Sequence, residues 1–213
     1  MRKRPRNRKR PRASSAETER KIVNAALAIA ARKGFEQATT AEIARRAGVA
    51  EGSIYNYFRT KDDLLIHMVE QYATSFLQQL GDEIRAESDA IGKLDRLISF
   101  HLRFFTQEGN IFQVVYGKTP GTKVQMARIM RVAIVPYVGL IEEIIREGIA
   151  QGKLRKLNPQ IAASFLLGGL QVTLLRRFFD LADYGPDEAV SQVRNRYLDG
   201  LIAKQKGIGA ASE

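Results

Sequence analysis

The sequence predicts an all-α protein in which an N-terminal three-helix unit precedes a C-terminal helical bundle. Apolar residues recur three and four positions apart along most of the 213-residue chain, which is the period of an amphipathic α-helix. Gly and Pro are sparse and fall between these periodic segments. No segment combines sustained alternation with enrichment in β-branched residues, so no strand is predicted.

The first helix is predicted over residues 15–33. Ser14 and Glu17 have capping-box spacing at its start, and Gly34 can end it in the left-handed conformation. Thr39 and Glu42 form a second capping box, which opens a short helix that ends near Ala47.

Gly48 then predicts a tight turn, because glycine readily takes the positive φ that a sharp reversal needs. A second short helix is expected over residues 51–57. Thr60 and Asp63 cap a longer helix that is expected to reach Leu80.

Five further helical segments are predicted in the C-terminal part. Pro136 lies inside the third of them and is expected to kink it. The segments cover residues 89–107, 111–116, 123–151, 159–181 and 186–204.

The formal net charge of +11 is concentrated at the N-terminus, where eight basic residues fall within the first twelve. The rest of the chain is close to neutral. A polycationic tail beside a folded unit is typical of contact with phosphate, although it can also be a solubilising terminus. We therefore expect a basic tail over residues 1–13, a first domain over 14–62 and a second over 63–206.

The composition argues against several other classes of protein. The chain has no Cys, which excludes disulfides and thiolate chemistry and suits a cytoplasmic location. No uninterrupted apolar run approaches the roughly 18–20 residues of a membrane span, so no membrane partner is expected. His67 and His101 lie on separate predicted helices without nucleophile–base spacing. We expect no enzyme activity, no metal and no cofactor.

Residues 39–65 carry the most informative pattern, TTAEIARRAGVAEGSIYNYFRTKDDLL. Two short helices joined by a turn at Gly48 are typical of a helix-turn-helix, whose first helix braces and whose second enters the major groove of DNA. Small and polar residues near the start of the second helix allow close approach to a duplex. The predicted DNA contacts are Thr40, Glu51, Gly52, Ser53, Tyr55, Asn56, Tyr57 and Lys61.

This stretch resembles the TetR family of transcriptional repressors. The resemblance rests on AGVAEGSIYNYFRTKDDLL, the preceding TTAEIA and the helix that ends in Gly34-Phe35, and it covers about residues 16–66. It implies that Thr40, Tyr55, Tyr57 and Lys61 meet phosphates, and that Glu51, Gly52, Ser53 and Asn56 face the operator. Ala50 departs from the family, which often has a capping Ser or Thr there, so one contact is in doubt.

The resemblance also implies that the last two long helices form a four-helix interface in a homodimer. Apolar faces around Phe165 and Gly169, and around Val193 and Tyr197, fit such an interface or burial within one subunit. Family members bind effectors inside the C-terminal bundle, and the apolar residues here predict a small hydrophobic or amphipathic effector. The predicted effector-binding residues are His101, Phe105, Tyr116, Met130, Tyr137 and Gln171.

The sequence thus predicts a repressor that binds double-stranded operator DNA as a dimer and is released by a small molecule. Two alternatives remain open. One is a non-specific or architectural DNA-binding protein that depends on the basic tail. The other is a transcriptional activator with the same fold.

Overall fold

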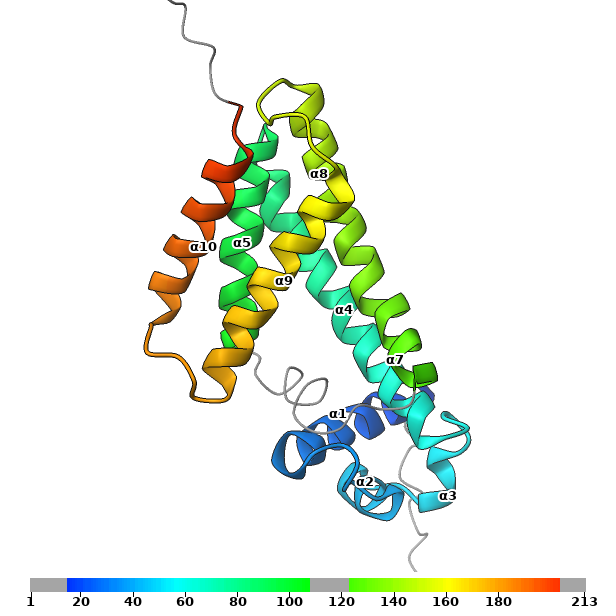
Figure 1. Ribbon diagram of the computed structural model, residues 1–213. Coiled ribbons are helices and arrows are strands. Elements are labelled where there is room, and N and C mark those ends of the chain that lie inside the picture. Colours follow the sequence, from blue (N-terminus) through cyan, green and yellow to red (C-terminus); the bar gives the residue numbers. More distant parts are fainter. Residues whose placement is uncertain (1–14, 108–122, 204–213) are drawn as a thin grey trace, which may run out of the picture.

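The computed structural model describes residues 15–107 and 123–203, and within them it confirms an all-α fold (Figure 1). The predicted segments at Ser14 and at residues 111–116 lie outside the described ranges. Extended pairing within these ranges is limited to one isolated bridge, Leu154 with Ile202. The helices are α1 (Ser15–Lys33), α2 (Thr40–Ala47), α3 (Glu51–Ile54), α4 (Lys61–Arg85), α5 (Ala90–Gln107), α7 (Lys123–Ile129), the π-helical segment η1 (Met130–Ile134), α8 (Val135–Ala150), α9 (Pro159–Phe178) and α10 (Pro186–Leu201).

Helices α1 to α3 and the start of α4 enclose a small apolar core at the lower end of Figure 1. Ile22, Ile43, Ile54 and Leu64 are almost completely buried in it. Gly34 and Gly48 have φ values of +85° and +70°, so both predicted left-handed turns are confirmed. These two turns reverse the chain and bring the first three helices around one core.

The second half of α4 joins α5, α8, α9 and α10 in a bundle with a second core. In this bundle α8 packs against α9, and α10 packs mainly against α5. Helix α4 therefore contributes to both cores, with Leu64 and Met68 in the first and Phe76 and Leu80 in the second.

Four predicted helix ends are wrong. In the bundle, α9 ends at Phe178 and not at residue 181, and α10 ends at Leu201 and not at residue 204. The other two are the ends of α4 and α3. Helix α4 continues past Leu80 to Arg85, because Ile84 also packs into the bundle core and outweighs the helix-breaking tendency of Gly81. Helix α3 ends at Ile54 and not at Tyr57; turns follow, and Phe58 is buried as a second anchor. Ala50 makes no side-chain cap at the start of α3, as its chemistry predicts.

Pro136 coincides with a local change in helix geometry. The preceding η1 segment has π-helical hydrogen bonding, and the backbone N–H of Val135 donates to the carbonyl of Met130, five residues earlier. Proline supplies no backbone N–H, and its ring crowds the carbonyl four residues before it. Widening the preceding turn accommodates both effects, so the irregularity predicted at Pro136 takes the form of a π-bulge.

The expectation that no stretch has membrane-span length was too strict. Residues 123–150 and helix α9 are long and apolar enough to span a membrane by length and composition. Polar residues interrupt both segments, so neither contains a long uninterrupted apolar run although each is apolar on average. Helix α8, which makes up most of the first segment, packs against α9 in the bundle. A helix of a folded core can have the same length and composition.

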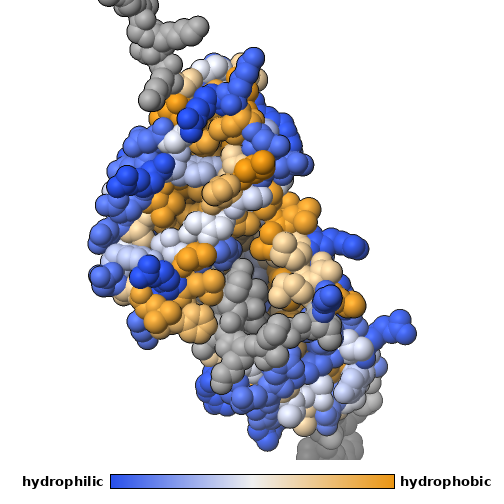
Figure 2. Space-filling view, in the orientation of Figure 1, coloured by the Kyte–Doolittle hydropathy of each residue, from blue (hydrophilic) through white to orange (hydrophobic). Residues whose placement is uncertain are grey.

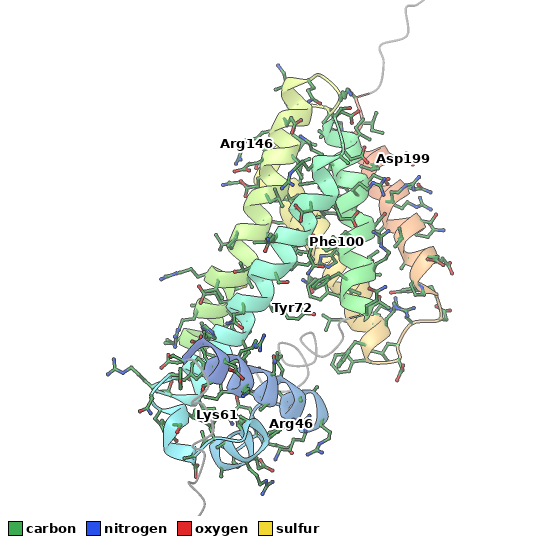
Figure 3. All side chains as sticks on the ribbon, turned by 180° about the vertical axis from the view of Figure 1, so that it is seen from behind. Arg46, Lys61, Tyr72, Phe100, Arg146 and Asp199 are labelled. Atoms are coloured by element: carbon green, nitrogen blue, oxygen red, sulfur yellow. The ribbon has the colours of Figure 1, made fainter. Side chains whose placement is uncertain are left out.

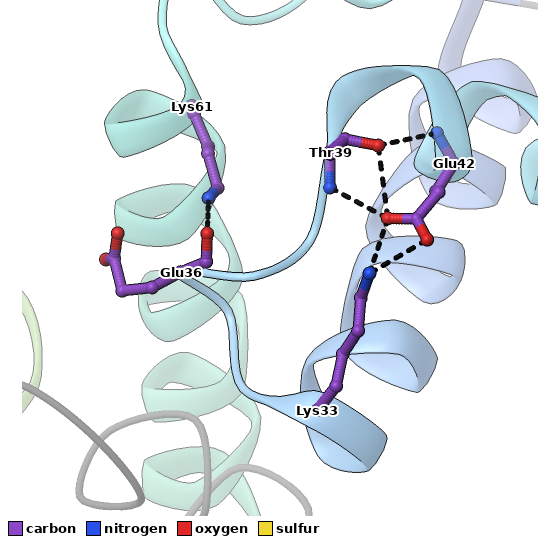
Figure 4. A network of polar contacts seen from close by, with 5 residues as sticks. All are labelled: Lys33, Glu36, Thr39, Glu42 and Lys61. Carbon is purple, nitrogen blue, oxygen red and sulfur yellow. Dashed lines mark hydrogen bonds and ion pairs between the residues drawn. The ribbon is translucent and has the colours of Figure 1, made fainter.

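The start of α2 is fixed by a polar network (Figure 4). Thr39 Oγ1 accepts from the backbone N–H of Glu42, and the Glu42 carboxylate accepts from the backbone N–H of Thr39, so the capping box is confirmed. Lys33 Nζ also lies 2.6 Å from Glu42 Oε2. The hydrogen bond from Lys33, together with those from Thr39, lowers the pKa of Glu42 to about 2.

This network predicts a pH dependence of stability. Because the pKa of Glu42 is lower in the folded state than its ordinary value of 4.5, its contribution to stability is complete above pH 4.5 and is lost as the pH falls towards about 2. Glu42→Gln should be less stable than the wild type at neutral pH, and the difference should shrink between pH 5 and 2. Urea unfolding across this range checks it; a difference that is independent of pH would contradict it.

Candidate functional site

The first candidate site is the outer surface of the helix-turn-helix. Ile54 and Phe58 anchor α3 and the turn after it in the core, with only 2% and 5% of each residue exposed. Tyr55 and Asn56 lie between these anchors and are exposed. Tyr55 is 52% exposed, so it belongs to the outer surface and not to the core.

The other predicted DNA contacts share this surface to different degrees. Glu51 and Gly52 are exposed, whereas Thr40, Ser53, Tyr57 and Lys61 are half-buried. Thr40 Oγ1 donates to Glu51 Oε1 over 2.7 Å, which joins the bracing helix α2 to the start of α3. The Glu51 carboxylate therefore already has one partner across the two helices.

Lys61 lies at the first position of α4 and faces the loop after α1 (Figures 3 and 4). Its Nζ donates to the carbonyl of Glu36 over 2.7 Å and lies 5.1 Å from the centre of the Phe35 ring. An ammonium has three donors, so a phosphate oxygen can be bound in addition to this carbonyl. The contact holds the side chain in a defined place beside the outer surface.

Three arginines add positive charge to the same unit. Arg45, Arg46 and Arg59 are exposed, and Arg59 directly precedes Thr60 and α4. Arg59 was not among the predicted contacts, although a basic residue between Tyr57 and Lys61 was a usable signal. Exposed arginines can neutralise phosphates without reading the sequence of bases.

The second candidate site is a cavity of about 110 Å³ between α4, α5, α7, η1, α8 and α9. Its walls are almost entirely apolar. Five of the predicted effector-binding residues line it, namely His101, Phe105, Met130, Tyr137 and Gln171, while Tyr116 lies outside the described residues. The other lining residues are Val69, Tyr72, Ala73, Phe76, Met126, Ile129, Ala133 and Ile134.

The contribution of α4 to this cavity was missed from the sequence. Tyr72 and Phe76 are four positions apart and so share one face of that helix, which was the available signal. Figure 3 shows Tyr72 and Phe100 in the region where α4 meets the rest of the bundle. Periodicity alone does not distinguish such a wall from ordinary core.

His101 is the most deeply buried polar residue of the cavity. It is 0% exposed, and its Nδ1 lies 3.0 Å from the hydroxyl oxygen of Tyr137. The two rings stack with an interplanar angle of 13°, and Phe105 lies against the imidazole. Burial lowers the pKa of His101 to about 3 and raises the pKa of Tyr137, so both side chains are uncharged at neutral pH.

An apolar stripe along α9 forms a third surface. Ile161, Phe165 and Val172 are 57%, 75% and 56% exposed, and Gly168 lies on the same face of the helix. In Figure 2 apolar surface is exposed on the side of the bundle that α9 crosses. The predicted α10 stripe, by contrast, is partly buried against the bundle core, and Tyr197 donates its hydroxyl hydrogen to the carbonyl of Ala162.

Within residues 15–107 and 123–203, no group of three or more His, Asp or Glu side chains is arranged to hold a metal ion. The cavity contains one histidine and no carboxylate among its described lining residues. The arrangement is suited to holding an apolar molecule.

Comparisons with solved structures and known proteins agree with this organisation. The fatty acid degradation regulator FadR of Bacillus halodurans superposes with a TM-score of 0.78 at 24% identity, covering 91% of this chain and 98% of that one. FadR of Bacillus subtilis, solved in complex with stearoyl-CoA, gives 0.79 at 24% identity over 85% and 98% of the two chains. The fatty acid metabolism regulator protein of Bacillus subtilis (strain 168) is 27% identical over 154 residues, 72% of this chain and 79% of its own length.

Two family models match the chain. Residues 22–68 match the model of bacterial regulatory proteins of the tetR family, which covers the helix-turn-helix. Residues 87–174 match the tetracyclin repressor-like C-terminal domain, which covers most of the bundle. Together the matches span more than half of the sequence, and the chain belongs to the TetR family of bacterial transcriptional regulators.

Proposed function

We propose that the protein is a transcriptional repressor that binds an operator as a homodimer and is released by an effector with a long apolar chain. The exposed surface between the two buried anchors Ile54 and Phe58 carries the DNA-binding part of this proposal. In the proposed complex Asn56 and Ser53 contact bases, while Thr40, Tyr55, Tyr57 and Lys61 contact phosphates. Glu51 and Gly52 complete the surface that faces the major groove.

The α9 stripe supports the proposed homodimer. Isolated exposed apolar residues are normal, but Ile161, Phe165 and Val172 follow one face of one helix and need a covering surface. Gly168 on that face lets a second α9 approach closely. A two-fold dimer also gives two reading surfaces, which an operator with two half-sites requires.

The apolar cavity supports the proposed effector. The stearoyl-CoA complex of the Bacillus subtilis FadR structure provides the precedent of an acyl compound bound by a protein of the same fold. A volume of about 110 Å³ is well below the roughly 300 Å³ at which small-molecule sites begin. An acyl chain therefore has to displace part of the wall when it enters.

Helix α7 is the part of the wall that links the cavity to the DNA-binding unit. Met126 and Ile129 line the cavity. From the same helix, Arg128 Nη2 donates to Asp63 Oδ1 over 2.8 Å and Gln125 Nε2 donates to Asp62 Oδ1 over 3.1 Å. Outward movement of α7 therefore pulls on the first turn of α4, next to Lys61.

The coupling works as a shift between two populations. An effector that binds an expanded cavity more tightly favours the state in which α7 and the first turn of α4 have moved. If this state holds the two DNA-binding surfaces at the wrong spacing, operator affinity falls by at most the factor by which effector affinity differs between the states. We infer a cytoplasmic regulator without enzyme activity or membrane partner, as expected from its sequence.

Operator recognition is testable by selecting bound sites from a random duplex pool, which should return an inverted repeat. Asn56→Ala should reduce the affinity of the protein for the selected operator by about 5–150-fold, because a paired base contact is worth about 1–3 kcal/mol. Binding to unrelated duplex DNA should stay constant, since Asn56 does not set phosphate affinity. Fluorescence anisotropy measures both affinities, and Gln78→Ala, an exposed change on α4 within the bundle, is the control.

The same assay separates specific recognition from binding by the tail. Deleting residues 1–12 should weaken binding and its salt dependence while the preference for the operator remains. Loss of all sequence preference in the deleted chain would instead support the architectural alternative. Reporter expression from the selected operator, with and without the protein, then decides between repression and activation.

The role of α7 predicts a change in coupling. With saturating stearoyl-CoA, wild-type operator affinity should fall by roughly 5–150-fold, a typical range for allosteric proteins. Arg128→Gln should shrink this ratio several-fold, because the pull on Asp63 is removed, while stearoyl-CoA still binds. Arg146→Gln removes a surface ion pair with Glu142 within α8 and should leave the ratio unchanged. Equal ratios in all three proteins would contradict coupling through α7.

A further inference from the structure

Two buried polar atoms in the cavity have no hydrogen-bond partner among the described residues. They are Nε2 of His101, from α5, and Oε1 of Gln171, from α9. Both side chains line the cavity, whose other lining residues are mainly aliphatic, aromatic or Met. Leaving a buried polar atom unpaired destabilises the folded protein, so two of them in one apolar site call for a physical reason.

The hydrogen bond between His101 and Tyr137 determines whether Nε2 of His101 donates or accepts a hydrogen bond. The Tyr137 residue is only 4% exposed, and the partner of its hydroxyl is Nδ1 of His101 at 3.0 Å. If this hydroxyl donates to Nδ1, the proton of the neutral imidazole must be on Nε2. The opposite arrangement would leave the buried hydroxyl hydrogen without an acceptor. His101 therefore presents an N–H donor at Nε2, and Gln171 presents a carbonyl acceptor.

We infer that the molecule held in this cavity carries an uncharged group that accepts a hydrogen bond from His101 Nε2 and donates one to Gln171 Oε1. A hydroxyl group on an otherwise apolar chain has this chemistry. The inference rests on the proposed effector role of the cavity and specifies the polar group of the ligand, which an acyl chain alone does not supply.

Charged groups fit the site poorly. None of the described lining residues carries a formal charge, and His101 is held neutral by its burial. A carboxylate or ammonium placed beside His101 would lose its hydration without gaining a counter-ion, which is costly in an apolar environment. A hydroxyl loses two hydrogen bonds to water and regains both from the protein.

A set of three probes isolates the two hydrogen bonds. Octan-1-ol can accept and donate, 1-methoxyheptane can only accept, and nonane can do neither, while all three have the same number of non-hydrogen atoms. Met126 and Met130 line the cavity, so the NMR signals of their methyl groups report occupancy of this site in the full-length protein. Each probe is compared with itself across protein variants, which cancels its differing transfer from water.

His101→Phe, combined with Tyr137→Phe so that the hydroxyl that donates to Nδ1 is not left unpaired, should weaken octan-1-ol and 1-methoxyheptane about tenfold each and leave nonane unchanged, because the donor at Nε2 is lost. Gln171→Met should weaken octan-1-ol alone by a similar factor, because the ether donates nothing. Unchanged nonane binding also shows that each variant keeps its folded cavity. Ile134→Val, a change in the cavity wall without a polar atom, should affect the three probes alike.

The inference is overturned if the variants change octan-1-ol and nonane binding by the same factor, since a bound water would then satisfy both atoms. It is also overturned if saturating octan-1-ol leaves both methionine signals unmoved. Operator affinity is measured in parallel with stearoyl-CoA and with octan-1-ol. If the probe pattern holds while neither compound alters operator binding, the ligand chemistry stands and the proposed effector role fails.

Discussion

Helix α4 is the constraint on which the rest of the structure depends, because one continuous helix contributes to both apolar cores. Leu64 and Met68 are buried in the first core, and Phe76 and Leu80 are buried in the second. Neither core can form without fixing the direction of this helix, so the helix-turn-helix and the bundle are held in register. Tyr72 lies between these pairs and packs against both cores.

The cavity lies beside this shared helix, so its walls border both the bundle and the DNA-binding unit. Its walls include residues of α4 and of α7, and Ile129 of α7 is also buried in the core of the DNA-binding unit. A ligand in the cavity therefore contacts side chains that also pack against the DNA-binding unit. The π-bulge of η1 adjoins the same wall, and such irregular turns occur frequently at functional sites.

The polar groups around the cavity and helix α7 are of two kinds, those paired with each other and those without a described partner. Between α7 and the first turn of α4, Asp62 and Asp63 accept hydrogen bonds from Gln125 and Arg128, and the hydrogen bond from Arg128 lowers the pKa of Asp63. Inside the cavity, His101 and Gln171 keep atoms free of any described partner. The first kind fixes the relative position of two helices, whereas the second kind is the basis of the proposed selection between molecules that enter the apolar site.

The sequence by itself determined the local structure and the family. The Thr39–Glu42 capping box, the turns at Gly34 and Gly48 and the helical periodicity depend on neighbouring residues, and the structure confirms each of them. The motif around residues 39–65 also identified the family, because its chemistry is contiguous in the chain.

Tertiary structure decided where α3 and α4 end, since burial of Ile54, Phe58 and Ile84 outweighs local propensity. It also decided that α4 and η1 wall the cavity, that one face of α10 packs against α5 and that His101 pairs with Tyr137. These features join residues far apart in the sequence, and periodicity predicts a buried face without indicating what that face packs against.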